Sequence, residues 1–235
     1  MDQIAHFVVL LSLCAGILNA EAGPVSSGSS STNAIPAFPA DKPPLKKIAP
    51  GIFELGKVRL DKNQRTISFP ALLNMKEALA EYLVVNTAGK THESLLRTEA
   101  EPWHVHVAML LLGAKGTQGN PFPENKSKPL PGDPVRIELR WAEKGSRLAC
   151  QAEDCILDVH TTKTMSRGNW IFVGSRFEEG VFKAQQDGSI ISLIEDPDAL
   201  VNNPRVGRDN DDNWRIKTEG LPPLDTLVEV VIHLE

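Results

Sequence analysis

The part of the chain that begins at Ile52 consists of short runs in which hydrophobic and polar residues alternate. Alternation with a period of two predicts β-strands that bury one face, and the Gly-, Asn- and Asp-containing segments between the runs predict turns. Two hairpins are expected, one turning at residues 61–64 and the other at 143–145. About nine strands are predicted in all, the further runs lying at residues 81–86, 91–97, 169–177, 181–186, 189–195 and 226–234.

One segment has the pattern of a helix. Residues 101–114 read EPWHVHVAMLLLGA, in which Pro102 suits the first helical position and Gly113 can end the helix. Residues 105–112 are apolar apart from His106, so we expect the helix to be buried on all sides. Shorter helices are predicted at two further places, residues 152–159 and 196–203.

These elements predict an α+β domain over residues 51–235. Its strands form a mostly antiparallel sheet, sandwich-like or partly closed, and the one buried helix lies at about residues 102–112. A chain of 235 residues is long enough for one such domain with a real hydrophobic core.

The N-terminal part has the composition of a targeting segment followed by a linker. Residues 7–18 form an apolar run that is short for a bilayer span, and Ala20-Glu21-Ala22 has the A-x-A form of a signal-peptidase site. We therefore expect a signal peptide over 1–22, although no Lys or Arg precedes the apolar run. Residues 23–50 are rich in Ser and Pro, which predicts a linker.

A signal peptide implies a periplasmic or extracellular protein without a transmembrane helix in its mature chain. The alternative is a lipoprotein anchored at Cys14, but Leu13 stands where a small residue is required. The formal net charge of −5 and the lack of a basic block argue against nucleic acid as a partner. The expected partner is an envelope protein or a small ligand.

Cleavage of the signal peptide leaves two of the three cysteines, Cys150 and Cys155. In an exported protein this pair either forms a disulfide or remains as two thiols with Cys155 buried, and the sequence leaves both open. One C-x4-C pair is not a zinc-ribbon pattern. Two cysteines also cannot supply the four thiolates of an iron–sulfur cluster, so no cluster is expected.

Candidate chemistry concentrates just before and inside the predicted helix. In a strand, His92 and Ser94 face one side and Glu93 the other, whereas His106 on the helix points into the core. One hypothesis is that His92 and His106 converge, with Glu93 or Glu101 nearby, on a transition metal or a substrate. The alternative is a buried, hydrogen-bonded histidine. Ser94 is a further nucleophile candidate, but no strand-to-helix elbow surrounds it.

An acidic loop near the C-terminus is a second candidate. Asp209-x-Asp211-x-Asn213 imitates the first ligands of an EF-hand loop, but Trp214 occupies the place of the required glycine. Asp211 and Asp212 are thus candidate ligands of a divalent metal. The alternative is a solvated loop whose aspartates cap a short helix.

Several short motifs follow one another in a distinctive order. They are FPALLN (69–74), KTHESLL (90–96), a helix with Pro102, His106, Ala108 and Gly113, a strand with Trp170, Phe172, Gly174 and Ser175, the turn Asp187-Gly188, and Asp196, Pro197, Ala199, Leu200, Asn203 and Pro204. In this order they resemble the YdjY domain family of bacterial proteins. The resemblance runs from about Ile52 to Glu235.

The resemblance indicates which residues to test, but it does not imply a particular chemical activity. Family members often carry export signals, and the ferredoxin-like relatives carry cysteine-rich cluster motifs that this chain lacks. The polar positions of the family pattern map onto Lys90, His92, Glu93, Ser94, His106, Asp196, Asn203, Asp211 and Asp212. Among these, Lys90, Asp196 and Asn203 are expected to bind a ligand.

The leading expectation is therefore an exported binding or assembly module of the bacterial envelope with an unidentified ligand. The alternative is a metal-dependent or acid–base enzyme centred on His92, Glu93 and His106. Such an enzyme would hold a divalent metal.

Overall fold

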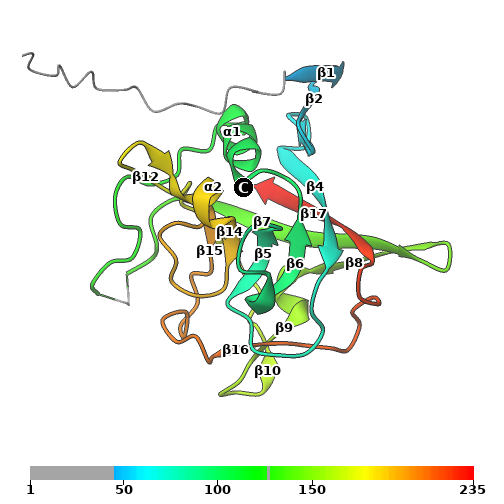
Figure 1. The fold of residues 1–235 in the computed structure, drawn as a ribbon, viewed down its shortest axis with the longest axis vertical. Helices are drawn as coiled ribbons and strands as arrows, with labels where there is room; N and C mark the ends of the chain where they lie inside the picture. The colour runs from blue at the N-terminus through cyan, green and yellow to red at the C-terminus, as the bar shows by residue number, and fades with distance from the viewer. Residues whose placement is uncertain (1–44, 126–127) are drawn as a thin grey trace, which may run out of the picture. The chain divides into compact units, whose positions relative to one another are not determined.

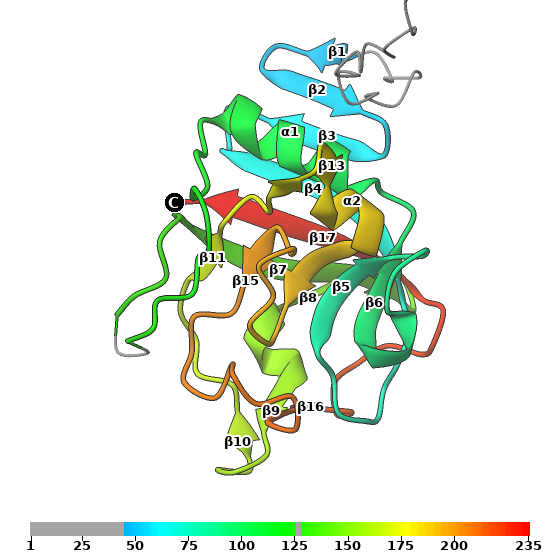
Figure 2. The same ribbon diagram turned by 60° about the vertical axis from the view of Figure 1, so that its left-hand side comes forward.

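The computed structural model describes residues 45–125 and 128–235. The predicted signal peptide (1–22) lies outside these residues, as does the predicted linker (23–50) up to residue 44. The last part of the segment assigned to the linker forms the first strand, β1 (Lys46–Ala49). Figures 1 and 2 show the fold from two directions.

Eight strands form a closed barrel. In order around the ring they are β4 (Thr66–Leu73), β17 (Leu227–Leu234), β7 (Asp133–Glu143), β11 (Trp170–Phe172), β15 (Val201–Asn202), β14 (Ser189–Ser192), β5 (Tyr82–Asn86) and β6 (Ser94–Thr98). β6 returns to β4 through the pairs Leu72–Arg97 and Leu73–Leu96, which closes the ring. The expected fold class, a sandwich-like or partly closed sheet with one helix, was therefore wrong.

The ring closes because one edge of β4 pairs with two different strands. The first part of β4 pairs with β3 (Val58–Asp61), and its last two residues pair with β6. The sheet therefore forks at β4: one branch closes the barrel, and the other continues through β3 and β2 (Ile52–Leu55) to β1. We call this second branch the β1–β3 arm. Hydrophobic alternation reports which face a residue takes but not which strand it pairs with, so the pattern did not predict the fork.

Two of the strand pairs in the ring are parallel, β5–β6 and β14–β15. A parallel pair requires the chain to return to the same end of the barrel before the second strand begins. Residues 87–93, which include the 3-10 helix η1 (Thr91–Glu93), make this return for β5 and β6, and residues 193–200 make it for β14 and β15. These two connections carry four of the nine polar residues predicted to be functional, namely Lys90, His92, Glu93 and Asp196.

The helix α1 (Pro102–Leu112) has the bounds predicted from the sequence. Gly113 ends it with a φ of 102°, in the left-handed region that favours glycine. It packs against β3, β4 and β14, but Leu110 and Leu111 remain 42% and 37% exposed. The helix is therefore buried on one face, and not on all sides as expected.

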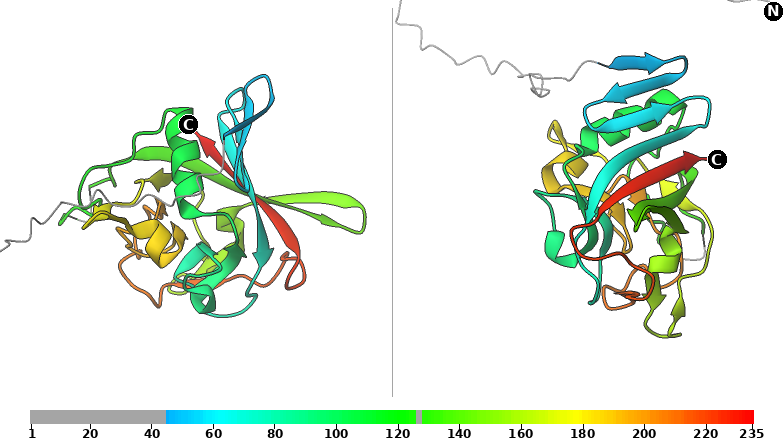
Figure 3. Two further views of the ribbon diagram at one scale, coloured as in Figure 1. Left: turned by 45° about the horizontal axis from the view of Figure 1, so that its top comes forward. Right: turned by 90° about the vertical axis from the view of Figure 1, so that its right-hand side faces the viewer.

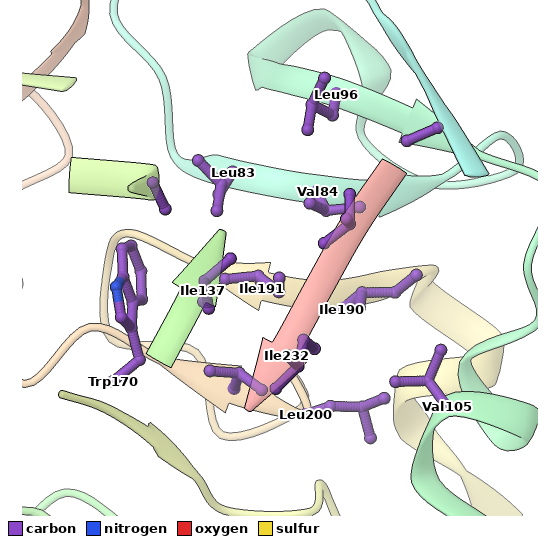
Figure 4. Close-up of a cluster of buried hydrophobic side chains, with 14 of the residues drawn as sticks. Leu83, Val84, Leu96, Val105, Ile137, Trp170, Ile190, Ile191, Leu200 and Ile232 are labelled. Carbon is purple, nitrogen blue, oxygen red and sulfur yellow. The ribbon is translucent and has the colours of Figure 1, made fainter. Parts of the chain in front are cut away.

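Aliphatic side chains and Trp170 form a cluster of buried hydrophobic residues in the core (Figure 4). Residues from six strands and from α1 meet there without solvent exposure, each contributing about 1.5–3 kcal/mol relative to an exposed side chain. They include Leu83, Val84, Leu96, Val105, Ile137, Trp170, Ile190, Ile191, Leu200 and Ile232.

The remaining elements lie outside the ring. β8 (Ser146–Gln151) pairs with β7 and extends it into a long hairpin. The other elements are the 3-10 helix η2 (Ala152–Cys155), the three-stranded sheet of β9 (Ile156–Asp158), β10 (Lys163–Thr164) and β16 (Trp214–Ile216), the hairpin of β12 (Phe177–Glu178) and β13 (Val181–Phe182), and α2 (Lys183–Asp187).

Two predicted helices are absent from the described residues. Residues 152–159 form η2 and then β9, and residues 196–203 form a turn and β15. No helix in the described part of the chain is both long enough and apolar enough to cross a bilayer.

Candidate functional site

The turn between β5 and β6 places three of the predicted residues at the surface. His92 is 74% exposed, and its Nε2 atom lies 2.8 Å from Oε1 of Glu93. The Lys90 ammonium lies 3.4 Å from Oε2 of Glu81 and 5.3 Å from the centre of the Tyr82 ring. We call Glu81, Lys90, His92 and Glu93 the carboxyl turn.

Glu81 is a member of this turn that the sequence analysis missed. It stands opposite Glu93 because the register of the parallel pair sets Tyr82 beside Ser94, and its N–H donates to the Glu93 carbonyl at 3.0 Å. Burial raises the pKa of Glu81, as do a hydrogen bond with the Glu93 carboxyl and repulsion from it, while Lys90 acts in the opposite direction. Glu81 therefore keeps its proton to a higher pH than an ordinary glutamate.

A second polar group surrounds Asp196, a predicted binding residue. Its carboxylate accepts a hydrogen bond from the Tyr82 hydroxyl at 3.1 Å and one from the Asp198 N–H at 2.8 Å. Burial, and then the Asp196 charge, raise the pKa of Tyr82, so the phenol stays neutral. Asp198 is neutralised by Arg176, whose Nε donates to it at 2.6 Å. Asp196 thus helps to fix the 193–200 connection against β5.

Ser94 and Asn203 are fully buried, and their side chains form hydrogen bonds with backbone groups. The Ser94 hydroxyl donates to the Leu96 carbonyl at 2.7 Å. The Asn203 amide donates to the Leu193 carbonyl at 2.9 Å, and its oxygen accepts from the Arg205 N–H at 3.1 Å. Neither side chain faces solvent, so in this structure neither is placed to attack or bind a ligand.

His106 lies in an aromatic enclosure away from the carboxyl turn. Its ring is 5.6 Å from that of Trp103, 5.9 Å from Phe172 and 5.0 Å from Phe182, measured between ring centres. Burial lowers the pKa of His106 to about 4. Nδ1 is buried and has no hydrogen-bond partner among the described residues.

The candidate metal ligands are not brought together. His92 is exposed beside Glu93, His106 is enclosed by aromatic rings, and Asp211 and Asp212 lie in an exposed loop before β16. Across residues 45–125 and 128–235, no group of three or more His, Cys, Asp or Glu side chains is arranged to hold a metal ion.

The two cysteines are close but unbonded. The Sγ atoms of Cys150, at the end of β8, and Cys155, at the end of η2, are 3.3 Å apart. Cys155 is buried and Cys150 is partly exposed. Of the two states that the sequence left open, the dithiol is the one described here.

A groove that the sequence did not suggest lies on the outer face of the barrel. The β1–β3 arm and the β7–β8 hairpin diverge on either side of β17 (Figure 3) and enclose a volume of about 870 Å³. Strand register places Pro70, Glu229, Arg140 and Ala149 side by side across four strands of its floor. Leu148 and Leu227, 39% and 63% exposed, add apolar surface.

The walls of this groove carry mostly positive charge. Lys57, Arg59, Arg140 and Arg147 line it, against a single acid, Glu229. Lys57 pairs with Glu99, and Arg140 pairs with Glu138 at 2.8 Å. Arg59 and Arg147 make no side-chain ion pair or hydrogen bond with any described residue. We call this feature the basic groove.

Fold and surface together define a class of protein: a closed, mostly β barrel that carries a projecting arm and a charged groove. Within that class, the chain belongs to the YdjY domain family, whose model matches residues 58–233. The matched range covers every strand of the barrel and most of the basic groove. No curated protein and no solved structure matches the chain.

Proposed function

We propose that this protein is an exported binding module of the bacterial envelope, and that its basic groove holds an acidic, extended segment of a partner protein. The observation that carries the proposal is the pair Arg59 and Arg147, which line the groove and form no ion pair with a described residue. Uncompensated guanidinium groups favour carboxylates, which they bind in a bidentate manner. Export is supported by the signal-peptide pattern of residues 1–22.

The shape of the groove favours an extended peptide. Its floor is a sheet surface of four strands, of which β8 is the last. Among the described strands β8 pairs with β7 alone, so its outer edge has free backbone groups. A peptide strand can add to such an edge, and its alternate side chains then point into the groove. Alternating acidic and apolar residues would match the arginines and the exposed leucines.

Binding of a fluorescein-labelled peptide of alternating Asp and Leu, followed by anisotropy, tests this proposal. The protein is taken from the exported fraction of a bacterial host, and its mass shows whether the chain starts at Gly23. The double variant Arg59→Glu/Arg147→Glu is expected to bind about tenfold more weakly, since each lost pair contributes up to about 1 kcal/mol. The matched control is Arg215→Glu, an exposed arginine on β16 outside the groove.

Three outcomes contradict the proposal. One is equal binding by the double variant and the Arg215→Glu control. Another is equal binding of a Lys-Leu peptide, which would show that charge does not select the ligand. The third is tighter binding of an anionic polysaccharide, anionic vesicles or single-stranded nucleic acid than of the acidic peptide.

One observation favours the alternative function, an acid–base enzyme, but with a different set of residues from the one predicted. The pKa of Glu81 is raised beside Glu93 and the exposed His92, which is an arrangement of groups that can donate or accept protons. His106 does not belong to it. An enzyme of this kind would therefore use Glu81, Glu93 and His92, and its first requirement is the raised pKa of Glu81.

A further inference from the structure

The base of the β7–β8 hairpin holds the two thiols in a fixed geometry. Cys150 is anchored in the ladder opposite Leu139, and Cys155 ends the single turn of η2. Between them, the Gln151 N–H donates to the Asp154 carboxylate at 3.1 Å, and the Gln151 side chain accepts from the backbone of Asp154. This reciprocal cap sets the separation of the Sγ atoms at 3.3 Å.

A disulfide needs a separation of about 2.05 Å between its sulfur atoms. The sulfur atoms of Cys150 and Cys155 are 3.3 Å apart and thus within about 1.3 Å of bonding distance.

The surroundings make the two thiols unequal. A hydrogen bond from the Cys155 thiol lowers the pKa of Cys150, and Arg167 acts in the same direction, while burial, Asp154 and Glu138 oppose them. For Cys155, the same hydrogen bond, burial and the negative charges of Cys150 and Asp154 raise the pKa, against the opposing effect of Lys217. The partly exposed sulfur is the better thiolate, and the buried sulfur keeps its proton.

We propose that Cys150 and Cys155 form a reversible thiol–disulfide site that exchanges electrons with small or protein-borne disulfides, Cys150 being the entry residue. The Cys150 thiolate attacks one sulfur of the oxidant, forms a mixed disulfide and releases the first thiolate. Cys155 then loses its proton to solvent and attacks the sulfur of Cys150, which releases the second thiolate. Two electrons pass from the cysteines to the oxidant, which is reduced to two thiols.

The site is placed to act on the edge of the basic groove. Cys150 follows Arg147, Leu148 and Ala149 directly, and these three residues line the groove. The position of η2 is fixed by packing, because its residues Ala152 and Glu153 are buried. The disulfide ties the end of the open strand β8 to η2. The redox site stands on its own geometry and does not require the proposed peptide ligand.

Equilibration of the purified protein in glutathione buffers of different ratio, followed by acid quenching, alkylation and mass spectrometry, tests the proposal. The wild-type protein is expected to pass from two alkylated thiols to none in one two-electron transition. Cys155→Ser is expected to accumulate one glutathione on Cys150, because the second attack is absent. Cys150→Ser is expected to remain largely unmodified, because Cys155 is buried.

Circular dichroism shows whether each variant is folded, and Cys155→Ala replaces Cys155→Ser if the buried hydroxyl prevents folding. Two free thiols in the wild-type protein at every glutathione ratio would overturn the proposal. Equal glutathione loading of the folded Cys150→Ser and Cys155→Ser variants would overturn the assignment of Cys150 as the entry residue.

Discussion

At the scale of single residues, the aromatic enclosure of His106 sets its charge. Burial lowers the pKa to about 4, so the folded protein keeps this imidazole neutral while the unfolded chain protonates near pH 6.5. Between these two values the unfolded state binds more protons. Stability is therefore lost as the pH falls from 6.5 to 4, by on the order of 2–3 kcal/mol.

We expect the variant His106→Phe to lose much of this pH dependence. Phenylalanine keeps the contacts with Trp103 and Phe182 but does not titrate. Urea unfolding at pH 4, 5, 6 and 7 measures the effect, with the exposed His160→Gln as the control that keeps the wild-type slope. His104 and His233, whose pKa values are also lowered by burial, leave a residual slope. An unchanged slope in His106→Phe would contradict the enclosure described here.

Glu81 makes a second prediction at this scale. Because Glu93 raises its pKa and Lys90 lowers it, Glu93→Gln should lower the pKa of Glu81 and Lys90→Met should raise it. The chemical shift of the Glu81 carboxyl carbon, followed in an NMR titration, measures both changes in pKa. A raised carboxyl pKa stabilises the fold below pH 4.5 and loses that contribution as the pH rises through the folded value. No shift in either variant would remove the basis for an acid–base function.

The sequence predicted His106 on the core side of its helix, because helical spacing places it there. It did not predict Glu81, because the pairing of Glu81 with Glu93 depends on strand register. The structure does not bring His92 and His106 together: His92 is exposed beside Glu93, whereas His106 on α1 lies among aromatic rings.

At the scale of elements, one buried ion pair joins η2 to the segment that follows β15. Nη2 of Arg205 lies 2.7 Å from Oε1 of Glu153, and the two side chains are 10% and 2% exposed. Arg205 also donates to the carbonyls of Ser166 and Gly168 at 2.6 and 2.9 Å and lies over the Trp170 ring. One guanidinium group thus joins the segment after β15 to η2 and to residues 166–168.

The variant Arg205→Leu is expected to destabilise the protein by about 3–5 kcal/mol, because it leaves the Glu153 carboxylate buried without a counter-charge. Chemical denaturation measures the change. Arg167→Leu is the matched control: Arg167 also pairs with a carboxylate, that of Asp154, but is 68% exposed, so its loss should cost less than about 1 kcal/mol. The double variant Glu153→Leu/Arg205→Leu should recover part of the loss, and equal effects of the two arginine variants would contradict this account.

Element bounds were predictable where the signals were local. Pro102 and Gly113 delimit α1 by their own backbone preferences, so the helix begins and ends where the sequence indicated. The helix predicted over residues 152–159 does not form. Only the first four of these residues form a helical turn, η2, and Ile156 then pairs with Ile216, some sixty positions away. Tertiary pairing outweighed the local helical preference there.

At the scale of the whole molecule, neither the closure of the barrel nor the basic groove was predicted. The charged residues of the groove come from three distant places along the chain, and no spacing in the sequence relates these places: Lys57 and Arg59, then Arg140 and Arg147, then Glu229. The acidic balance of the chain also directed attention away from a basic surface, since net charge says nothing of how charges are distributed. Only strand order, which brings β3, β4, β17, β7 and β8 side by side, assembles the groove.

The fork of the sheet at β4 separates the closure of the barrel from the attachment of the β1–β3 arm. The barrel closes through the last residues of β4, whereas the arm is attached through its first residues. Lys57 and Arg59 are the residues of the arm that line the groove, so substitutions at these two positions change one wall of the groove while the pairs that close the barrel stay intact. The family match begins at residue 58, the first residue of β3, so β1 and β2 lie before it. The charge of this groove wall is thus separable from the closure of the ring, because neither Lys57 nor Arg59 takes part in the closing pairs.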